Sequence, residues 1–413
     1  MYRFDKKTED AIRGELHKKF DAGITHLPSS LKIKKCEHIV SGDFTTDFEG
    51  HLIQLLSTTV EMFEGNCYPC VINTVNQKNA LAGIVKNVPV IAVHLFMVAD
   101  CVSLAHAYMM FDDFFAMTYP TVRYDYTYKP ATIDEHGNLS FVSPKSNEKK
   151  IMADMIAYLS VKFILLHESA HHSLNHVKNT AGKKNTASKW LYSNAGDNMT
   201  LNGIQSQALE TEADTWATAR LLRDFIQIKK CFDEQCPQEL SYLDVVKALY
   251  LAVLIPLLNN DHEYTKEMVL SSSHPPSFMR YNDVKVVFGC FFGIKPNESH
   301  ANEFWHLVKD EMINDYANAE WKRESYIDML RRYDVPTENV DVYEKVKEDD
   351  IEYVKYFVLN WFTDVFVYIV LRFRYMHDED CVNIVEVYRN VLEINKQLES
   401  EGVYDNRDIR IEV

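Results

Sequence analysis

The stretch "LLHESAHHSLNH", residues 165–176, places four histidines and a glutamate inside an apolar pattern. Apolar residues recur every three or four positions over about 147–178, which predicts a long helix. His167 and His171 are four residues apart and share one helix face, so both imidazoles can reach one metal ion. Glu168 lies on the neighbouring flank, where a base can take a proton from a water at the metal. The pattern H-E-x-x-H therefore indicates a metal-dependent hydrolytic site.

A second motif supplies the ligand that two histidines leave missing. The segment "QALETEADTWATARLL" lies in a second predicted helix, about 204–228. A catalytic zinc site uses three protein ligands and keeps one position open, and Glu210 is predicted to be the third ligand. Asp214, one turn later, is predicted to accept a hydrogen bond from the far nitrogen of a ligating histidine, which fixes its tautomer. This second motif argues against a chance match, and the prediction is one Zn²⁺ per chain.

Two other patterns have simpler interpretations. His172 and His176 are also four apart, but on a continuous helix their pair is rotated away from the first. A solvated helix face is the simpler account, and a second metal site is the alternative. Cys67 and Cys70 form a C-x-x-C pattern. Two small buried residues are preferred there over a redox or zinc-knuckle role.

Composition excludes several classes of function. Of the 413 residues, 46% are hydrophobic, 25% are charged and 12% are aromatic, which is typical of a globular protein. The net charge of −16 argues against nucleic acid and anionic membrane surfaces as partners. The nearest candidate for a membrane span, 356–371, is short and carries Asp364 in its middle, so a buried helix is expected. Eight cysteines without a secretory signal indicate free thiols and a cytoplasmic location.

The pattern of elements predicts an α+β fold. The segment 70–94 is rich in β-branched residues interrupted by Asn and Gly, which predicts two or three strands joined by turns. The segment 122–142 is expected to be extended, and 242–260 to be an apolar helix. Helical periodicity dominates after a soft boundary near 293–299. We therefore expect a catalytic domain over 1–290, followed by an all-α domain over 291–413, with an oligomeric state that the sequence does not reveal.

The motifs together resemble a known class of enzymes. H-E-x-x-H followed by E-x-E-A-D, which ends at Asp214, resembles the gluzincin metallopeptidases, most closely the HtpX and CAAX-prenyl-protease type. The segment "QKNALAG" is similar to the N-A-x-A segment of that family, with Asn79 and Ala80 at the matching positions. The segment "SSSHPPSFMR" is similar to its H-P-P-x-x-x-R segment, with His274 and Arg280 matching. The resemblance covers about 70–285.

This resemblance implies a zincin-like catalytic domain, in which active-site helices pack on a small sheet with an open edge strand. The segment from Asn79 through Ala80 to Ala82 would be that edge strand and would hold an extended peptide by main-chain pairing. His274 would help stabilise the oxyanion, as an alternative to a purely structural turn role. Arg280 would anchor its segment through an ion pair. Asn79 has the alternative of forming only a turn.

Departures from that type bear on function. HtpX-type and prenyl-protease-type enzymes are membrane proteins, whereas no spanning segment is expected here. The phage-exclusion peptidase Lit, a cytoplasmic H-E-x-x-H protein, is similar in this respect. The predicted function is zinc-dependent hydrolysis of a protein or peptide substrate, with Glu168 as general base. One alternative is a catalytically idle binding module with structural zinc, which has no need of Glu168. Another is a defence-type peptidase that is silent until triggered.

Overall fold

The computed structural model describes about half of the chain, with gaps. The described residues are 2–20, 23–26, 48–73, 77–110, 131–133, 139–177, 188–190, 203–236, 240, 242–258, 274, 280, 284 and 287–288. The domain boundary expected near 290, the helical domain 291–413 and the apolar segment 356–371 lie outside these residues and stay predictions.

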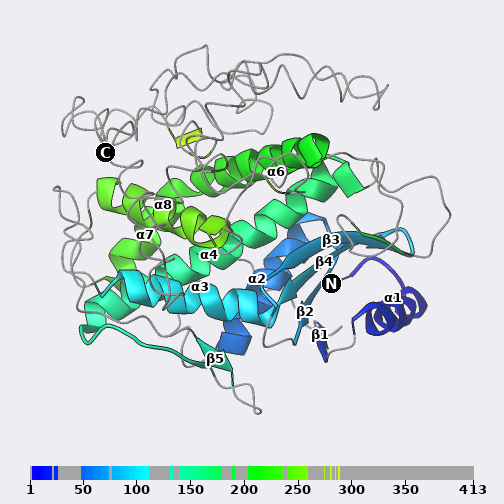
Figure 1. Cartoon of the computed structure of the whole chain (residues 1–413), viewed down its shortest axis with the longest axis horizontal. Coiled ribbons are helices and arrows are strands. Elements are labelled where there is room, and N and C mark those ends of the chain that lie inside the picture. Colours follow the sequence, from blue (N-terminus) through cyan, green and yellow to red (C-terminus); the bar gives the residue numbers. More distant parts are fainter. Residues whose placement is uncertain are drawn as a thin grey trace, which may run out of the picture. The chain divides into compact units, whose positions relative to one another are not determined.

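The chain divides into two compact units. The first comprises Met1–Thr200 and Asp224–Asn260, and the second comprises Leu201–Arg223 and Asp261–Val413. The first unit combines a small mixed sheet with several helices, which confirms the α+β class (Figure 1). In the second unit, the longest described element is helix α6 (Gly203–Arg223). Within the helices that the structure describes, none combines the length and the apolar character needed to cross a bilayer.

The sheet of the first unit has five strands in the order β1-β2-β4-β3-β7. β2 and β4 are parallel, and the other neighbouring pairs are antiparallel. The prediction of strands within 70–94 is therefore confirmed. The strand bounds are β1 Ile24–His26, β2 Tyr68–Ile72, β3 Ala80–Val85, β4 Val88–His94 and β7 Ser188–Trp190. Two short strands, β5 (Thr132–Ile133) and β6 (Leu139–Ser140), form a separate antiparallel pair in the segment expected to be extended.

A tight turn joins β3 and β4. Lys86 and Asn87 both have positive φ, 50° and 64°, and Val85 pairs with Val88 across the turn. Two consecutive residues with positive φ are the signature of the two-residue turn whose twist matches that of an antiparallel hairpin. The turn sets the register of β3 on β4, and with it the placement of the segment that begins at Asn79.

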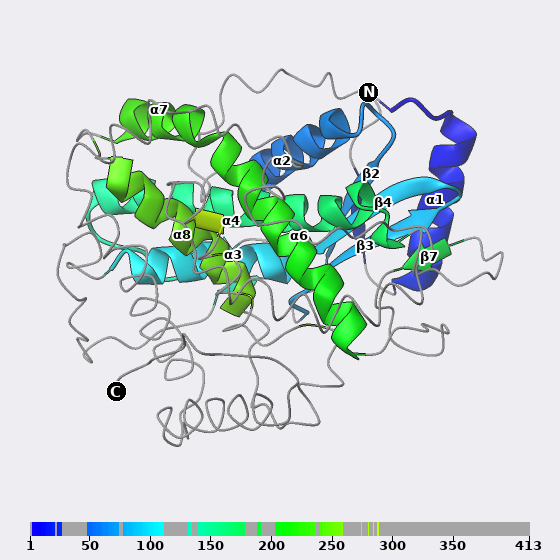
Figure 2. The ribbon, with the colours of Figure 1, turned by 90° about the horizontal axis from the view of Figure 1, so that it is seen from above.

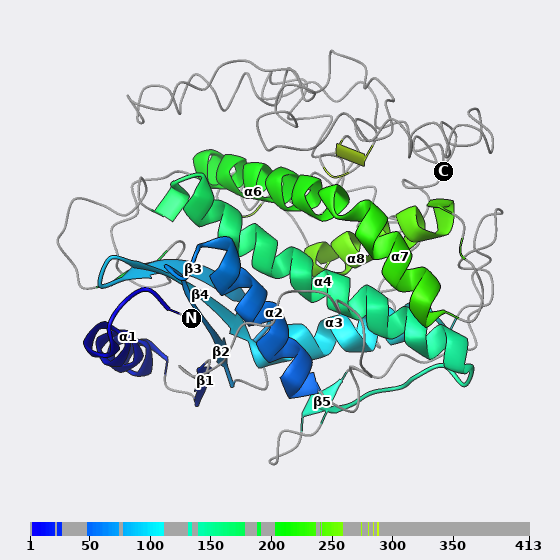
Figure 3. The same cartoon turned by 180° about the vertical axis from the view of Figure 1, so that it is seen from behind.

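The two faces of the sheet contact different helices. Alternate residues of β2 and β4, among them Tyr68, Cys70 and Val90, form a buried cluster with Ile12 and Leu16 of helix α1 (Lys6–Lys19). The opposite face packs against α2 (Phe48–Met62), α3 (Leu95–Tyr108) and α4 (Asn147–Ser173). Figure 3 shows α1 and α2 on opposite sides of the strands. This alternation follows from the period of two along a strand.

Helix α4 is the central helix of the first unit (Figure 2). It packs against α2, α3, β3 and β4, and also against α7 (Phe225–Gln235) and α8 (Tyr242–Leu258). Its residues are buried on nearly every side, which is typical of a helix enclosed by other elements. A catalytic group on α4 is therefore held in a rigid setting.

One expectation about the helices needs correction, and two helices were not expected. The single helix expected over 204–228 is two helices, because Asp224 ends α6 and caps α7 with non-helical angles. The segment 95–108, which was not predicted to be helical, forms α3. Nearly all of its side chains are buried, so it has no polar face and no amphipathic period to detect. The amphipathic helix α1 was also missed.

The C-x-x-C cysteines are structural. Cys67 and Cys70 are both free thiols and fully buried at the start of β2. Burial raises the pKa of the Cys70 thiol to about 12, so it stays protonated at neutral pH. A reactive or metal-binding cysteine needs the thiolate, so the expected packing role is favoured.

We expect His26 to make the protein sensitive to acid. His26 Nδ1 and the Tyr68 hydroxyl are hydrogen-bonded at 2.9 Å. Burial, followed by the charges of Arg13 and His17, lowers the pKa of His26 to about 4. An unfolded histidine takes up a proton near pH 6.5, so the unfolded state binds more protons between about pH 6.5 and 4, and stability falls as pH falls through this window.

The measurement is the urea midpoint at several pH values between 7 and 4 for the wild type and for His26→Gln, which cannot be protonated. The midpoint of His26→Gln should fall less steeply with acid. Parallel curves for the two proteins would contradict the assignment.

Candidate metal centre

Helix α4 positions the H-E-x-x-H motif. The helix begins at Ser146, whose hydroxyl accepts from the backbone N–H of Lys149, and the first turn carries Glu148. The apolar run that follows extends through the motif. The hydroxyl of Ser169, inside the motif, donates a hydrogen bond to the backbone carbonyl of Leu165 at 2.6 Å. His167 and His171 therefore lie one turn apart near the C-terminal end of a continuous, buried helix.

The two imidazoles converge as metal ligands should. Nε2 of His171 lies 3.1 Å from Nε2 of His167. Two nitrogens bound to one tetrahedral zinc ion at about 2.0–2.1 Å are separated by roughly 3.4 Å. The observed separation is close to that value, so the two Nε2 atoms are as near to each other as two ligands of one ion would be.

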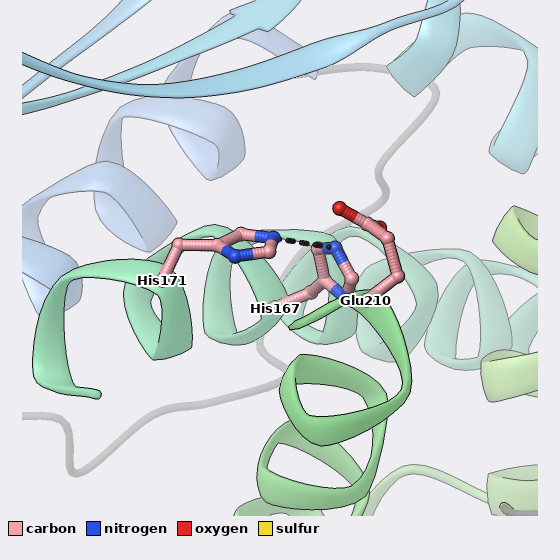
Figure 4. Close-up of side chains that lie close together, drawn as sticks. All are labelled: His167, His171 and Glu210. Atoms are coloured by element: carbon pink, nitrogen blue, oxygen red, sulfur yellow. Dashed lines mark hydrogen bonds between the residues drawn. The ribbon is translucent and has the colours of Figure 1, made fainter. Parts of the chain in front are cut away.

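Glu210 of α6 completes the group (Figure 4). One ligand atom each from His167, His171 and Glu210 lie within 4.8 Å of one another. All three residues are buried, with His171 and Glu210 each 1% exposed. Two imidazole nitrogens and one carboxylate oxygen form a donor set known from catalytic zinc sites, and a buried carboxylate favours a nearby cation. The residues therefore fit a metal ion.

Glu168 lies in the same buried environment. It follows His167 directly, so its side chain leaves the helix about 100° around the axis from that ligand. Its exposed fraction is 7%, equal to that of His167. A carboxylate in this position is adjacent to the ligands without sharing their face. This arrangement suits a base that takes a proton from a water molecule beside the metal.

Within the second unit, Asp214 is held by Arg280. Arg280 donates from Nε to Oδ2 at 2.6 Å and from Nη2 to Oδ1 at 2.8 Å, which is a bidentate ion pair. Both side chains are buried. Arg280 thus forms an ion pair of the kind expected for it. In the structure, both carboxylate oxygens of Asp214 accept hydrogen bonds from Arg280. The expected hydrogen bond from a ligating histidine to Asp214 stays a prediction.

His274 lies next to the proposed third ligand. Its Nε2 is 3.4 Å from Oε2 of Glu210, and Nη2 of Arg280 is 3.9 Å from the same oxygen. His274 is about one third exposed, whereas Glu210 is buried. The segment that carries His274 and Arg280 therefore supports α6 at the carboxylate. The oxyanion role of His274 stays a prediction.

We expect removal of Arg280 from its ion pair with Asp214 to destabilise the fold strongly. Arg280→Met leaves the Asp214 carboxylate buried without its partner, and breaking such a pair costs about 3–5 kcal/mol. The measurement is urea unfolding. Arg3→Met, which removes an exposed ion pair with Glu64, is the matched control and should cost about 0–1 kcal/mol. Equal losses in the two variants would contradict the assignment.

The proposed substrate segment is only partly open. β7 pairs with β3 at Gly83–Val85. β3 is therefore not the sheet edge along its whole length, and within the described residues its outer side is unpaired only at Ala80–Ala82. The expected edge strand is thus shortened. The strand that covers the rest of β3 is β7, which has three residues and lies in a segment predicted to be a polar loop. Three residues are too few to show a periodic pattern, so β7 could not be predicted from the sequence.

The side chains of this segment have local contacts. Asn79 Oδ1 accepts from the backbone N–H of Ala80 at 2.9 Å, and the Asn79 carbonyl accepts from the N–H of His94. The first bond joins neighbouring residues and the second continues the β3–β4 ladder, so the two alternatives for Asn79, substrate contact or a turn, both stay predictions. Ala82 is buried and packs with Val177 and Ile84. Any substrate contact of Ala82 would therefore use its main chain, and the role of Asn79, Ala80 and Ala82 in substrate binding stays a prediction.

The expectation of a solvated face for His172 and His176 is wrong. Nε2 of His172 donates to the carbonyl of Val90 at 3.1 Å, and burial lowers the pKa of His172 to about 4. His176 is 3% exposed, and its Nδ1 lies 2.9 Å from Nδ1 of His171. Helix α4 ends at Ser173, so the helical spacing that related His172 to His176 does not apply.

Comparison with known proteins identifies the region that carries this site. Residues 104–289 match the family model Peptidase U49, the Lit peptidase family. The match covers His167, Glu168, His171, Glu210 and His274, and it begins after the segment Asn79–Ala82. It confirms the resemblance to the Lit type. No curated protein and no solved structure matches the chain.

Proposed function

Because residues 104–289 match the Peptidase U49 model, that of the Lit peptidase family, we propose that the chain is a zinc-dependent endopeptidase. The observation that carries the proposal is the buried group of His167, His171 and Glu210 beside Glu168. A structural zinc site closes all four positions with protein ligands, whereas this group offers three and has a carboxylate next to it.

Each residue of the proposed site has a separate role in hydrolysis. When bound, a zinc ion polarises a carbonyl and lowers the pKa of water toward neutrality. His167, His171 and Glu210 would hold the ion, with Glu210 supplying the one negative charge among the three ligands. Glu168 would take the proton of the attacking water and deliver it to the leaving amine. The exposed part of His274 would face the developing oxyanion.

The substrate proposed is a protein or peptide in an extended conformation. Main-chain groups of Ala80–Ala82 on β3 are available for antiparallel or parallel pairing within the described part of the sheet. Pairing through the main chain would tolerate many side chains, so specificity would come from elsewhere. We further propose a cytoplasmic location, in keeping with the free cysteines and the net charge of −16.

The test compares new protein termini in cells that express the wild type or Glu168→Gln. Termini that appear with the wild type and are absent with the variant support an endopeptidase. Identical sets of termini, from a wild type shown to hold metal, would support the idle binding module instead. A set that appears only after stress or infection would support the alternative of a peptidase that is silent until triggered.

A further inference from the structure

We propose that His176 positions the metal ligand His171, by accepting the hydrogen bond from its Nδ1–H and so presenting its Nε2 to the metal. This inference rests on the proposed metal site. Both nitrogens of the His171 ring have a partner: Nε2 lies 3.1 Å from His167 Nε2, and Nδ1 lies 2.9 Å from His176 Nδ1.

The tautomers follow from the proposed metal site together with the geometry. A neutral imidazole that binds a metal through Nε2 carries its proton on Nδ1, so His171 must donate from Nδ1. The atom 2.9 Å away, His176 Nδ1, must then accept, which places the proton of His176 on Nε2. If His176 Nδ1 were protonated instead, His171 would carry its proton on Nε2 and could not bind the metal. With its proton on Nε2, His176 would stabilise the binding tautomer and the orientation of His171.

The end of helix α4 brings His176 into place. On a continuous helix, residues five apart lie about 140° apart around the axis and about 7.5 Å apart along it, so these rings could not meet. The helix ends at Ser173, and Asn175 adopts a left-handed conformation with φ of 62°. Asn tolerates this conformation better than most residues, and it turns the chain back toward the helix.

The returning segment is fixed by its neighbours. Val177 is 1% exposed and packs with Ala82 and Ile84 of β3, which anchors the segment to the sheet. His171 and His176 are both almost fully buried, so water does not compete for the hydrogen bond. The two ring centroids are 5.1 Å apart. Burial and packing together hold the pair in one arrangement.

A histidine in this position has a chemical consequence. Many ligating histidines donate to a carboxylate, which adds a negative charge near the metal. His176 offers a neutral acceptor, so the orientation of His171 is fixed without further charge. With such a neutral partner behind His171, the ligand set would leave a bound ion more of its positive charge for polarising a carbonyl oxygen.

The experiment measures zinc affinity by chelator competition in the full-length chain. His176→Phe keeps a ring and removes the acceptor, and it should weaken zinc binding by about 10–100-fold. His176→Asn keeps an acceptor near the position of Nδ1 and should recover most of that loss. His172→Phe is the matched control, because His172 is a partly buried histidine of the same segment that bonds the Val90 carbonyl, and this variant should bind zinc within about threefold of wild type.

A second measurement uses the wild type alone, so it does not depend on how the variants fold. In the zinc-loaded protein, ¹⁵N spectra of the imidazoles should show His171 protonated at Nδ1 and His176 unprotonated at Nδ1, with a coupling between these two nitrogens across the hydrogen bond. Unchanged zinc affinity in folded His176→Phe, or absence of the coupling, would overturn this inference and leave the metal site intact. A wild type that binds no metal would overturn both proposals.

Discussion

Glu168→Gln is expected to leave the protein folded and able to bind zinc, while hydrolysis falls by about 10²–10⁴-fold, the usual contribution of a positioned general base. The amide keeps the size and much of the hydrogen-bonding capacity of the side chain, which is buried in α4. It cannot take a proton from water. Since Glu168 is not one of the three grouped ligands, metal content and unfolding temperature should stay near the wild-type values.

The measurement combines metal analysis, thermal unfolding and the rate of appearance of new termini. Glu148→Gln is the control, because it makes the same chemical change in the exposed first turn of the same helix. It should leave the rate unchanged. Full activity in Glu168→Gln would remove the general-base role. Equal loss in both variants would show that the effect comes from the helix as a whole.

The second large effect is expected from the ligands. His167→Ala and Glu210→Ala each remove one of three donors. Residues that only hydrogen-bond to metal ligands contribute about 10–100-fold to metal affinity, so loss of a ligand should lower zinc affinity by more than that. Metal analysis after dialysis should find about one zinc per wild-type chain and none in either variant. His17→Ala, which removes an exposed histidine on α1, is the control and should retain zinc. Retention by both ligand variants would end the assignment.

The same variants separate a catalytic site from a structural one. In a structural zinc site, binding energy is folding energy, so loss of a ligand unfolds the domain. Here α4 is buried by contacts with helices and strands along most of its length, and the grouped ligands are a small part of its packing. We therefore expect the zinc-free variants to remain folded. Their unfolding temperature should match that of chelator-treated wild type and lie below that of the zinc-loaded protein, because an ion that binds only the folded state stabilises it.

The parts of the site that could be predicted from sequence depend on local geometry. The spacing of His167 and His171 on a helix places both rings on one face, whatever packs around it. Chemistry then required a third donor, and the pattern around Glu210 supplied one on a second helix. The β3–β4 hairpin was predictable for the same reason, since alternating β-branched residues and a short turn act within a few positions.

Other features depended on contacts between distant segments. Helix α3 is buried on nearly all sides, so packing partners rather than a polar face define it. The strand β7 is defined by its pairing with β3 and has no sequence pattern that predicts it. Asp214 binds Arg280, which lies 66 residues further along the chain. Sequence spacing shows which residues can share a face but not which distant group meets them.

His176 shows the division most clearly. Its sequence spacing indicated a partner for His172 on an exposed helix face, because helical periodicity was extended past Ser173. The left-handed turn at Asn175 and the packing of Val177 on β3 end that periodicity and turn the chain back. The sequence by itself determined which residues are candidates for two metal ligands, a base and a third donor, because these candidates follow from helix geometry and metal chemistry, and the structure groups His167, His171 and Glu210. Tertiary structure alone decided that His176 meets Nδ1 of His171, because that contact depends on where the helix stops and on what the returning chain packs against.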